Sequence, residues 1–239
     1  AIDKTEVGNQ VFDGNVDVAT TNVSPSAWFH ADLPATTFDP ARANKLLEDA
    51  GWVWGPDGIR SKGTLRAKIE LCTTDVKFRT DTAALIVGWL KDIGIEAITN
   101  AVSPNDLYAA FDPAAGEIPC AMSHSNFDLA LQGFTSPQDP LGNYFSYHSS
   151  QFEPNGVNDA QVAYPAIDTA LQAVRTSVDF GTVKRAMADF QAAYLATTAE
   201  IPIYYSRQVN LVNSRVGNFF ANATQAGPTW NVVDWFVKG

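Results

Sequence analysis

The chain has 239 residues, of which 46% are hydrophobic and 18% are charged, a balance typical of folded globular proteins. This length forms either one large domain or two small ones, each with room for a substantial core. The formal net charge of −10 argues against nucleic-acid binding, which requires a basic surface. No apolar run is long enough to span a membrane.

The opening segment, AIDKTEVGNQVFDG, has neither the charged start nor the apolar stretch of a signal peptide. It offers no recognisable N-cap, so we interpret it as the last part of a helix. Irregular chain is expected up to residue 37, because Ser24-Pro25 and Leu33-Pro34 interrupt regular structure.

The segment from Phe38 to Gly63 contains the clearest local signals in the chain. Asp39 is a good N-cap, and Pro40 suits the first helical position, where a missing N–H is not needed. The following apolar face consists of Ala43, Leu46, Leu47 and Ala50, and the helix ends at Gly51. After two tryptophans, Pro56-Asp57-Gly58 predicts a tight turn that leads into a strand.

The next elements predict a strand–helix–strand unit. Residues 65–74 alternate between apolar and charged side chains, which is typical of a strand with one covered face. The apolar positions are Leu65, Ala67, Ile69 and Leu71. A helix is expected over residues 80–93, ending at Gly94, and a second strand over residues 95–103. Such a unit favours parallel pairing with a right-handed crossover.

Beyond this unit the expected elements are shorter. We expect a short helix near Ser103-Pro104, a loop over residues 111–125 and a strand over residues 126–134. Residues 135–150 are rich in Ser, Pro, Gly, Asn and aromatics, so we expect a loop there. Two helices with apolar stripes follow, and residues 201–213 and 230–239 are expected to be extended. The stripes consist of Ile167, Leu171 and Val174, and of Val183, Met187, Phe190 and Tyr194.

Motifs that would indicate catalysis or a metal are absent from the sequence: there is no nucleophile elbow, zinc helix, phosphate loop or dinucleotide fingerprint. The three histidines lie in separate loops without ligand spacing, and we interpret them as surface or hydrogen-bonding residues. They are His30, His124 and His148. We therefore predict no cofactor, no bound metal and no catalytic residue.

Three carboxylates leave a hydrolase open, because glycosidases need two of them at a set separation that sequence spacing does not show. They are Asp112, Asp128 and Asp139. Each fits a turn or a strand start better than a catalytic role.

The only cysteines are Cys72 and Cys120, which allow one bridge and belong to no metal or redox motif. Cys72 lies on a predicted strand, where a small buried side chain is the simplest interpretation. The sequence leaves open whether they form a disulfide.

A binding site is predicted at the carboxyl ends of three strands, because ligands of open α/β sheets bind where the loops beyond those ends converge. The loops begin at Thr73–Val76, Val102–Asn105 and Phe134–Pro140. Aromatic faces with a few polar groups suit a small-molecule cleft. The predicted ligand-binding residues are Thr74, Phe134, Thr135, Ser136, Gln138, Asp139, Asn143 and Tyr144. For Tyr144, packing in the core beneath the loop is an equally good interpretation.

Several of these phrases together resemble the family 5 extracellular solute-binding proteins, which are the dipeptide-, oligopeptide- and nickel-binding receptors of ABC importers. The matching phrases are Ala1-Ile2-Asp3, Phe38–Gly63, Gly94-Ile95, Gly133-Phe134 to Asp139-Pro140, Ala166-Ile167-Asp168 and Ile201-Pro202-Ile203-Tyr204. The resemblance implies an α/β fold of the periplasmic-binding-protein type II class, with a mixed sheet flanked by helices.

The resemblance also implies a domain organisation. Residues 1–205 are expected to form the C-terminal ligand-binding lobe, and residues 206–239 to return toward an N-terminal lobe absent from this chain. The implied function is capture of an extracytoplasmic solute between the lobes and its delivery to a membrane permease. The implied location is the periplasm or the cell surface, where a lipid anchor is compatible with the family.

One departure from the family concerns the ligand. In peptide-binding relatives the corresponding strand leads to a tryptophan and then to an aspartate that pairs with the peptide's free amine. Here Phe134 replaces the tryptophan, and Ser136-Pro137 fills the place of the aspartate. A buried ammonium without a partner is costly, so the departure weakens the case for a peptide. Either an oligopeptide or an oligosaccharide is expected, the latter using Phe134, Gln138 and Asn143.

Two other functions remain open at this stage. The first is a sensory or regulatory module that uses the same lobe without a transporter. The second is a secreted carbohydrate hydrolase, which requires catalysis by the carboxylates named above.

Overall fold

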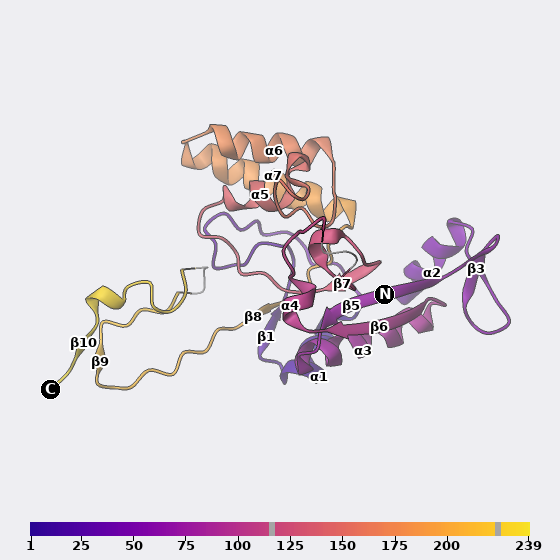
Figure 1. The fold of residues 1–239 in the computed structure, drawn as a ribbon, viewed down its shortest axis with the longest axis horizontal. Helices are drawn as coiled ribbons and strands as arrows, with labels where there is room; N and C mark the ends of the chain where they lie inside the picture. The colour runs from indigo at the N-terminus through magenta and orange to yellow at the C-terminus, as the bar shows by residue number, and fades with distance from the viewer. Residues whose placement is uncertain (115–117, 223–225) are drawn as a thin grey trace.

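The computed structural model describes residues 1–114, 118–222 and 226–239. Its centre is a parallel sheet in the order β6–β5–β7, formed by Glu96–Val102, Lys68–Thr74 and Leu129–Leu131 (Figure 1). Helix α3, Lys77–Asp92, connects β5 to β6 and covers one face. The expected α/β class and the parallel strand–helix–strand unit are confirmed, and the antiparallel pairs form three smaller sheets.

The sheet core lies between β5, β7 and α3. Its buried residues are Leu71, Ala83, Ile86, Leu90, Ile93 and Leu131. The expected helix begins at Lys77 instead of residue 80, because Val76 ends the extended chain without a side-chain cap. The strand expected over residues 65–74 is interrupted at Ala67. From Leu71 to Thr74 side chains on both faces of the strand are buried, so the prediction of one covered face does not hold for this second half.

A hairpin module precedes the sheet. It contains α2, Pro40–Asp49, and an antiparallel sheet of β2, Val53–Trp54, β3, Arg60–Lys62, and β4, Leu65–Arg66. Asp39 caps α2 by accepting from the Arg42 N–H at 2.8 Å, as predicted. Of the predicted apolar face, Ala43 and Leu47 pack on the sheet core, whereas Leu46 is 60% exposed and Ala50 is also exposed.

Arg60 explains why the module is attached so closely to α3. Its side chain is completely buried, and its Nε and Nη1 donate to the carbonyls of Ile93 and Trp52 at 2.9 and 2.8 Å. The guanidinium stacks on Trp54 at 4.3 Å. Gly94 lies under both side chains with φ of +82°, and a Cβ there would come within 2.7 Å of each. The phrase Trp–Trp–turn–Arg and the helix-ending glycine therefore form one packing unit.

A helical layer lies on the other side of the lobe (Figure 1). It consists of α5, Gly142–Tyr147, α6, Pro165–Thr176, and α7, Phe180–Thr197, with both predicted apolar stripes buried. Val23 and Phe29 from the irregular chain complete this core. Gln191 is buried and fixes that chain, because its amide donates to the Phe29 carbonyl at 2.9 Å. The expected loop over 135–150 is wrong in part, since α5 and a 3-10 turn, Ser149–Gln151, lie within it.

The first helix, α1, spans Lys4–Phe12, and Asp3 caps it by accepting from the Glu6 N–H at 3.0 Å. The expectation of a helix without an N-cap is therefore wrong. Strand β1, Val16–Val18, pairs antiparallel with β8, Tyr204–Ser206. These two strands bring the segments after α1 and after α7 side by side.

The remaining short elements are α4, Pro104–Leu107, the 3-10 turns Met122–His124 and Val232–Asp234, and an antiparallel pair of β9, Val216–Gly217, with β10, Phe236–Val237. Ser103 caps α4, which confirms that short helix. The strand expected over 126–134 is shorter, Leu129–Leu131. Residues 115–117 of the expected loop and 223–225 of the expected return segment lie outside the described residues.

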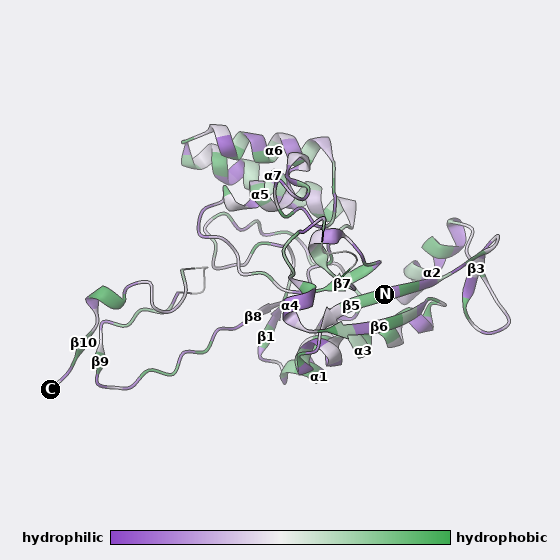
Figure 2. Ribbon diagram, viewed as in Figure 1, coloured by the Kyte–Doolittle hydropathy of each residue, from purple (hydrophilic) through white to green (hydrophobic). Residues whose placement is uncertain are grey.

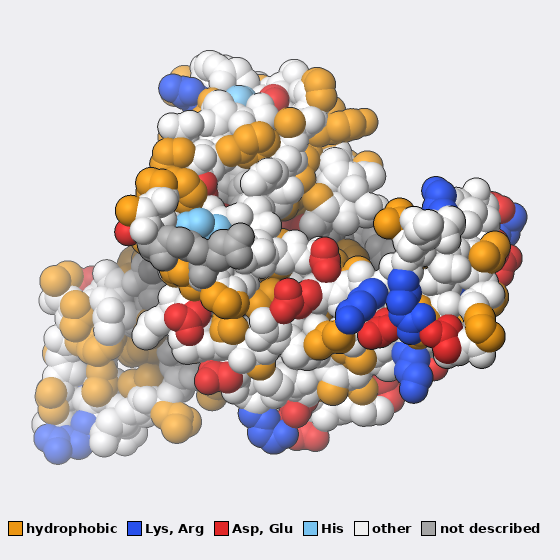
Figure 3. Space-filling model, turned by 45° about the vertical axis from the view of Figure 1, so that its right-hand side comes forward, with side chains coloured by type: hydrophobic (Ala, Val, Ile, Leu, Met, Phe, Trp, Pro, Cys, Tyr) orange, Lys and Arg blue, Asp and Glu red, His pale blue; other side chains and the backbone are white. Residues whose placement is uncertain are grey.

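The segment after β8 forms an extended arm that leaves the body of the lobe (Figure 1). Apolar residues recur along it (Figure 2), and space filling shows hydrophobic side chains gathered on its surface (Figure 3). Leu211 is 97% exposed and Val233 is 89% exposed. The described lobe therefore leaves large apolar side chains of the arm uncovered.

Candidate functional site

The three parallel strands end at one edge of the sheet, as the sequence predicts. β5 is in register with both neighbours, with Thr74 opposite Val102 and Thr73 opposite Leu131. Beyond Leu131 the chain continues through Gln132 and Gly133 into Phe134. The loops after the strands therefore start together, which is the usual geometry of a ligand site in an open α/β sheet.

Phe134 is the most accessible aromatic of this edge, with 59% of its surface exposed. Thr135, next in the chain, is also exposed, and Ser136 anchors the loop because its hydroxyl accepts from the Ser24 N–H at 2.8 Å. An exposed ring held on an anchored loop offers an apolar face to a ligand.

Gln138 and Asp139 lie farther along the same loop and line an open groove of about 570 Å³. Its other walls include Trp28 and Phe180, whose rings stack at 4.1 Å. Asp139 uses Oδ1 to accept from the Leu141 N–H at 2.9 Å, which gives it a turn-forming role.

Asn143 and Tyr144 have contacts inside the lobe. Asn143 is 3% exposed and donates to the Pro140 carbonyl at 3.0 Å. Tyr144 packs against the helical core, stacks on His148 at 4.3 Å and accepts from Arg175 at 3.1 Å. For Tyr144 these contacts support the packing interpretation, and its ligand role stays a prediction.

Thr74 is 2% exposed, and among the described residues its hydroxyl has no hydrogen-bond partner. The same holds for Oε1 of Gln132, which follows β7 at the adjacent position. Buried polar atoms normally have partners, so this edge retains hydrogen-bonding capacity. Gln132 was not among the predicted site residues.

Arg79 is a second residue of the edge that sequence reasoning missed. It lies in the first turn of α3, and its Nη1 donates to the Leu131 carbonyl at 3.2 Å. A Cβ on Gly133 would lie 3.2 Å from its Nη2. The sequence signals that could have identified it are an arginine shortly after β5 and a glycine, Gly133, shortly after β7.

The other chemistry-bearing residues have structural partners. Asp112, Asp128 and Asp139 accept from backbone N–H groups of Ala114, Glu70 and Leu141. The His30 ring shares a hydrogen bond with the Val23 carbonyl, His124 contacts Ser123, and His148 contacts Ser150. Each of the three carboxylates thus holds a backbone N–H group.

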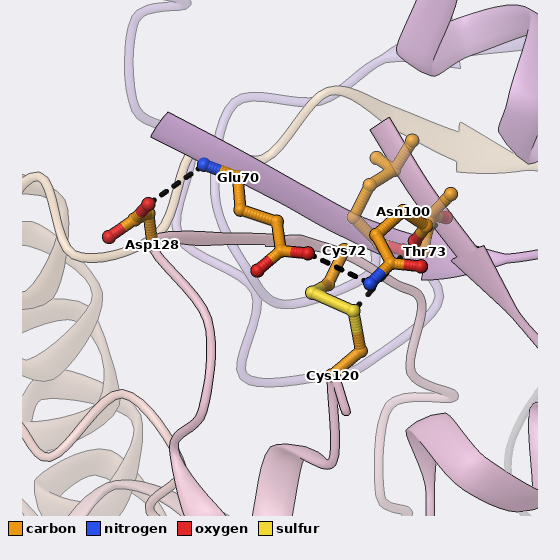
Figure 4. Close-up of a disulfide and its surroundings, with 7 residues drawn as sticks. Glu70, Cys72, Thr73, Asn100, Cys120 and Asp128 are labelled. Atoms are coloured by element: carbon orange, nitrogen blue, oxygen red, sulfur yellow. Dashed lines mark hydrogen bonds between the residues drawn. A yellow bond between two sulfur atoms is a disulfide. The ribbon is translucent and has the colours of Figure 1, made fainter. Parts of the chain in front are cut away.

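Cys72 and Cys120 form a disulfide on the face of β5 opposite α3 (Figure 4). Around it, Asn100 donates to Glu70 at 2.8 Å, and Asp128 accepts from the Glu70 N–H at 2.7 Å. The bridge ties the chain after α4 to the central strand. The sequence left open whether the two cysteines are bonded, and the structure shows that they are. Their sulfurs lie near the Glu70 carboxylate in an arrangement that resembles a set of metal ligands, but the sulfurs are bonded to each other.

Comparison with known proteins gives this geometry a family. Residues 1–155 match the model of the bacterial extracellular solute-binding proteins, family 5. The chain belongs to this family. Among curated relatives, the oligopeptide-binding protein AppA of Bacillus subtilis is 30% identical over 163 residues, covering 66% of this chain and 28% of AppA. Protein XP55 of Streptomyces lividans is 30% identical over 160 residues, 66% of this chain and 27% of that protein.

Solved structures agree on the fold. AppA of Bacillus subtilis, in complex with a nonapeptide, superposes with a TM-score of 0.79 at 21% identity, covering all of this chain and 46% of AppA. The oligopeptide-binding protein of Thermus thermophilus, complexed with a pentapeptide, gives 0.80 at 22% identity, covering 97% of this chain and 41% of that one. NikZ of Campylobacter jejuni, bound to Ni(L-His), gives 0.77 at 22% identity, covering 98% of this chain and 46% of NikZ.

The chain thus spans less than half the length of these relatives, of which AppA and the Thermus thermophilus protein are named as oligopeptide-binding proteins. Within the described residues, no helix combines the length and apolar character needed to cross a membrane.

Proposed function

We propose that this chain is the C-terminal ligand-binding lobe of a two-lobed receptor that captures an extracytoplasmic solute for an ABC importer. The observation that carries the proposal is the carboxyl edge of the sheet, which offers the exposed ring of Phe134 together with two buried polar atoms, Thr74 Oγ1 and Gln132 Oε1, that have no hydrogen-bond partner among the described residues. A permease in the membrane is the partner that such a receptor serves. Hinge closure over this edge would complete the site.

The arm supports the two-lobed arrangement. Leu211 and Val233 expose nearly all of their side chains, and the arm leaves the lobe after β8. A second lobe of the same receptor is the partner that we propose for this surface. The predicted boundary between residues 205 and 206 falls inside β8, Tyr204–Ser206, one residue before that strand ends, and we keep it as a proposal.

The solute is proposed to be an oligopeptide or an oligosaccharide. AppA and the Thermus protein were solved with peptides, which favours the first class. The exposed aromatic ring and neighbouring amide of Gln138 suit either. The three carboxylates bound to backbone amides support binding without catalysis. A location in the periplasm or on the cell surface, with or without a lipid anchor, follows from this role.

The test is a thermal-shift screen of the receptor carrying both lobes against short peptides and short oligosaccharides. A ligand at 100 times its Kd stabilises the protein by about 2.7 kcal/mol, which raises the melting temperature measurably. Phe134→Ala should reduce the shift, because it removes the exposed aromatic face. Leu65→Ala is the matched control, since Leu65 is 63% exposed but precedes the amino end of β5. Equal shifts in both variants would place the ligand elsewhere.

A further inference from the structure

Strand β6 forms one outer edge of the central sheet. The strand order is β6–β5–β7, and β5 is the only strand in the described chain that pairs with β6 (Figure 1). β6 is seven residues long, and Ile98, Thr99 and Ala101 on it are exposed. An unpaired edge presents a row of backbone N–H and C=O groups to which another strand can bond.

The hydrogen bonds to β5 show which backbone groups of β6 point away from the sheet. Glu96 donates its N–H to the Ala67 carbonyl at 2.8 Å, and the Asp75 N–H donates to the Val102 carbonyl at 2.9 Å. Backbone groups of successive residues in a strand point to opposite edges, so the even-numbered residues of β6 face β5. The odd-numbered residues face outward, and their N–H and C=O groups have no partner among the described residues. They are Ala97, Thr99 and Ala101.

β6 lacks the features that usually keep strand edges from pairing. Proteins protect such edges with charged side chains, proline or a bulge. From Ala97 to Val102 the strand contains neither a charged residue nor a proline, and its register with β5 is continuous. The charge of the strand is confined to Glu96 at its start. The edge is therefore open to pairing with a strand of matching register.

The outward groups are arranged symmetrically about Thr99. When a second copy of β6 lies antiparallel with the two Thr99 residues opposite each other, Ala97 of each copy lies opposite Ala101 of the other. Each of these pairs exchanges two N–H···O bonds, so every outward group of both copies gains a partner. Glu96 then lies opposite Val102, which keeps the two carboxylates at opposite ends of the interface. Threonine opposite threonine is a favourable cross-strand pair.

We propose that β6 pairs with the β6 of a second copy, so that the receptor forms a symmetric dimer with one continuous sheet through both copies. A twofold axis at a strand edge requires antiparallel pairing, which is the arrangement in which the outward groups of β6 match. The interface of a single strand pair is small, so the dimer is expected to be weak. The inference goes beyond ligand capture and does not depend on which solute binds.

The pairing leaves the candidate binding edge uncovered. β5, β6 and β7 are parallel, and their carboxyl ends lie at one edge of the sheet. In an antiparallel pair of β6 strands the carboxyl ends of the two copies point in opposite directions, so neither binding edge faces the other. We therefore expect dimerisation to leave the ligand affinity unchanged.

Cysteine cross-linking tests the register in the receptor carrying both lobes. In Thr99→Cys the new cysteines of two copies face each other at a Cα separation of about 5.5 Å, within the range that a disulfide spans. Mild oxidation should therefore give a covalent dimer. Ala97→Cys is the matched control, because its counterpart lies four positions along the pair, about 13 Å away, and should not cross-link with itself. A mixture of Ala97→Cys and Ala101→Cys should cross-link. The native cysteines are bonded to each other and do not compete.

Sedimentation velocity over a range of protein concentrations measures the association itself. It is run at about 0.15 M salt, because the net charge of −10 on this chain makes two copies repel each other at low ionic strength. We expect a concentration-dependent monomer–dimer equilibrium for the wild type. Thr99→Lys should raise the dimer dissociation constant about tenfold or more, since it places two like charges opposite each other. Thr64→Lys adds the same charge to an exposed turn of the hairpin module and should leave the equilibrium unchanged.

Other results overturn the inference. A wild type that stays monomeric at every concentration, as it would with another segment of the receptor paired to β6, refutes the dimer, and so does a dimer that Thr99→Lys does not weaken. Equal cross-linking of Thr99→Cys and Ala97→Cys refutes the register, and this comparison decides the question even where the lysine variant fails to fold. None of these results bears on ligand capture, which the thermal-shift screen tests separately.

Discussion

Replacing Glu200 by glutamine should stabilise the protein at neutral and alkaline pH. Glu200 follows α7 and precedes β8, close to the hydroxyl of Tyr147. Burial raises the pKa of its carboxyl from the usual 4.5 to about 7, and the hydrogen bond with Tyr147 acts in the opposite direction. Glutamine keeps the shape and the hydrogen-bonding capacity but carries no charge.

The sign follows from proton binding. In the unfolded chain Glu200 loses its proton near its usual pKa of 4.5, whereas the folded chain holds the proton up to about pH 7. The folded state therefore binds more protons between these values, and its free energy of unfolding falls as pH rises through this window. A pKa difference of one unit corresponds to about 1.4 kcal/mol, so the ionised group costs about 3 kcal/mol above pH 8. This is an upper value, because the residue as a whole is partly exposed.

Urea denaturation of the wild type and Glu200→Gln at pH 5, 6, 7 and 8 measures the effect. The difference in unfolding free energy should be about 1 kcal/mol at pH 5, where the carboxyl of the unfolded chain is already largely ionised, and should approach about 3 kcal/mol at pH 8. Asp159, whose pKa burial raises to about 6, is present in both proteins, so its contribution cancels in the difference. A difference independent of pH, or a variant less stable at pH 8, would refute the reasoning.

Three further experiments test the packing. Arg60→Met should cost about 2–4 kcal/mol in urea denaturation, because two buried carbonyls lose a charged donor. Gly94→Ala should lower the unfolding free energy by about 2 kcal/mol, since its φ is positive and its space is filled, whereas Gly88→Ala in open space on α3 should be neutral or slightly stabilising. Replacing both Cys72 and Cys120 by serine should lower the free energy of unfolding by about 4 kcal/mol, because the disulfide joins residues 48 positions apart. A double variant as stable as the oxidised wild type would contradict this.

The sequence predicted correctly those helices whose ends and buried faces are determined by residues close together in the chain. Asp39, Pro40 and Gly51 define α2 through capping and backbone geometry, and the stripes on α6 and α7 both face a core. The opening helix was misread because Asp3 was taken as part of the helix instead of its cap. The short β7 and the helix α5 depend on contacts with distant chain, such as the pairing of Leu131 with Thr73, which a local pattern does not contain.

The sequence predicted which edge of the sheet carries the candidate site, but it did not predict which side chains make contacts there. Parallel pairing follows from the order of elements, and it brings the ends of β5, β6 and β7 together. Side-chain availability at this edge depends on contacts that residue type does not contain: Asn143 is buried and donates to the nearby Pro140 carbonyl, whereas Arg79 reaches from α3 to the Leu131 carbonyl of β7. Residue type alone favoured Asn143, and only the fold distinguishes the two.

The arm and the lobe differ in how much of their apolar surface is buried within the described chain. In the lobe, Arg60 and Gln191 each donate two hydrogen bonds to backbone carbonyls, so contacts within the lobe hold the irregular segments in place. In the arm, Leu211 and Val233 gain almost no burial from the lobe. Burial of a single leucine or valine side chain contributes about 1.5–3 kcal/mol, so contact with a second lobe would stabilise the arm more than this lobe does. We therefore propose that hinge motion between the two lobes takes place at β1 and β8, where this lobe meets the arm.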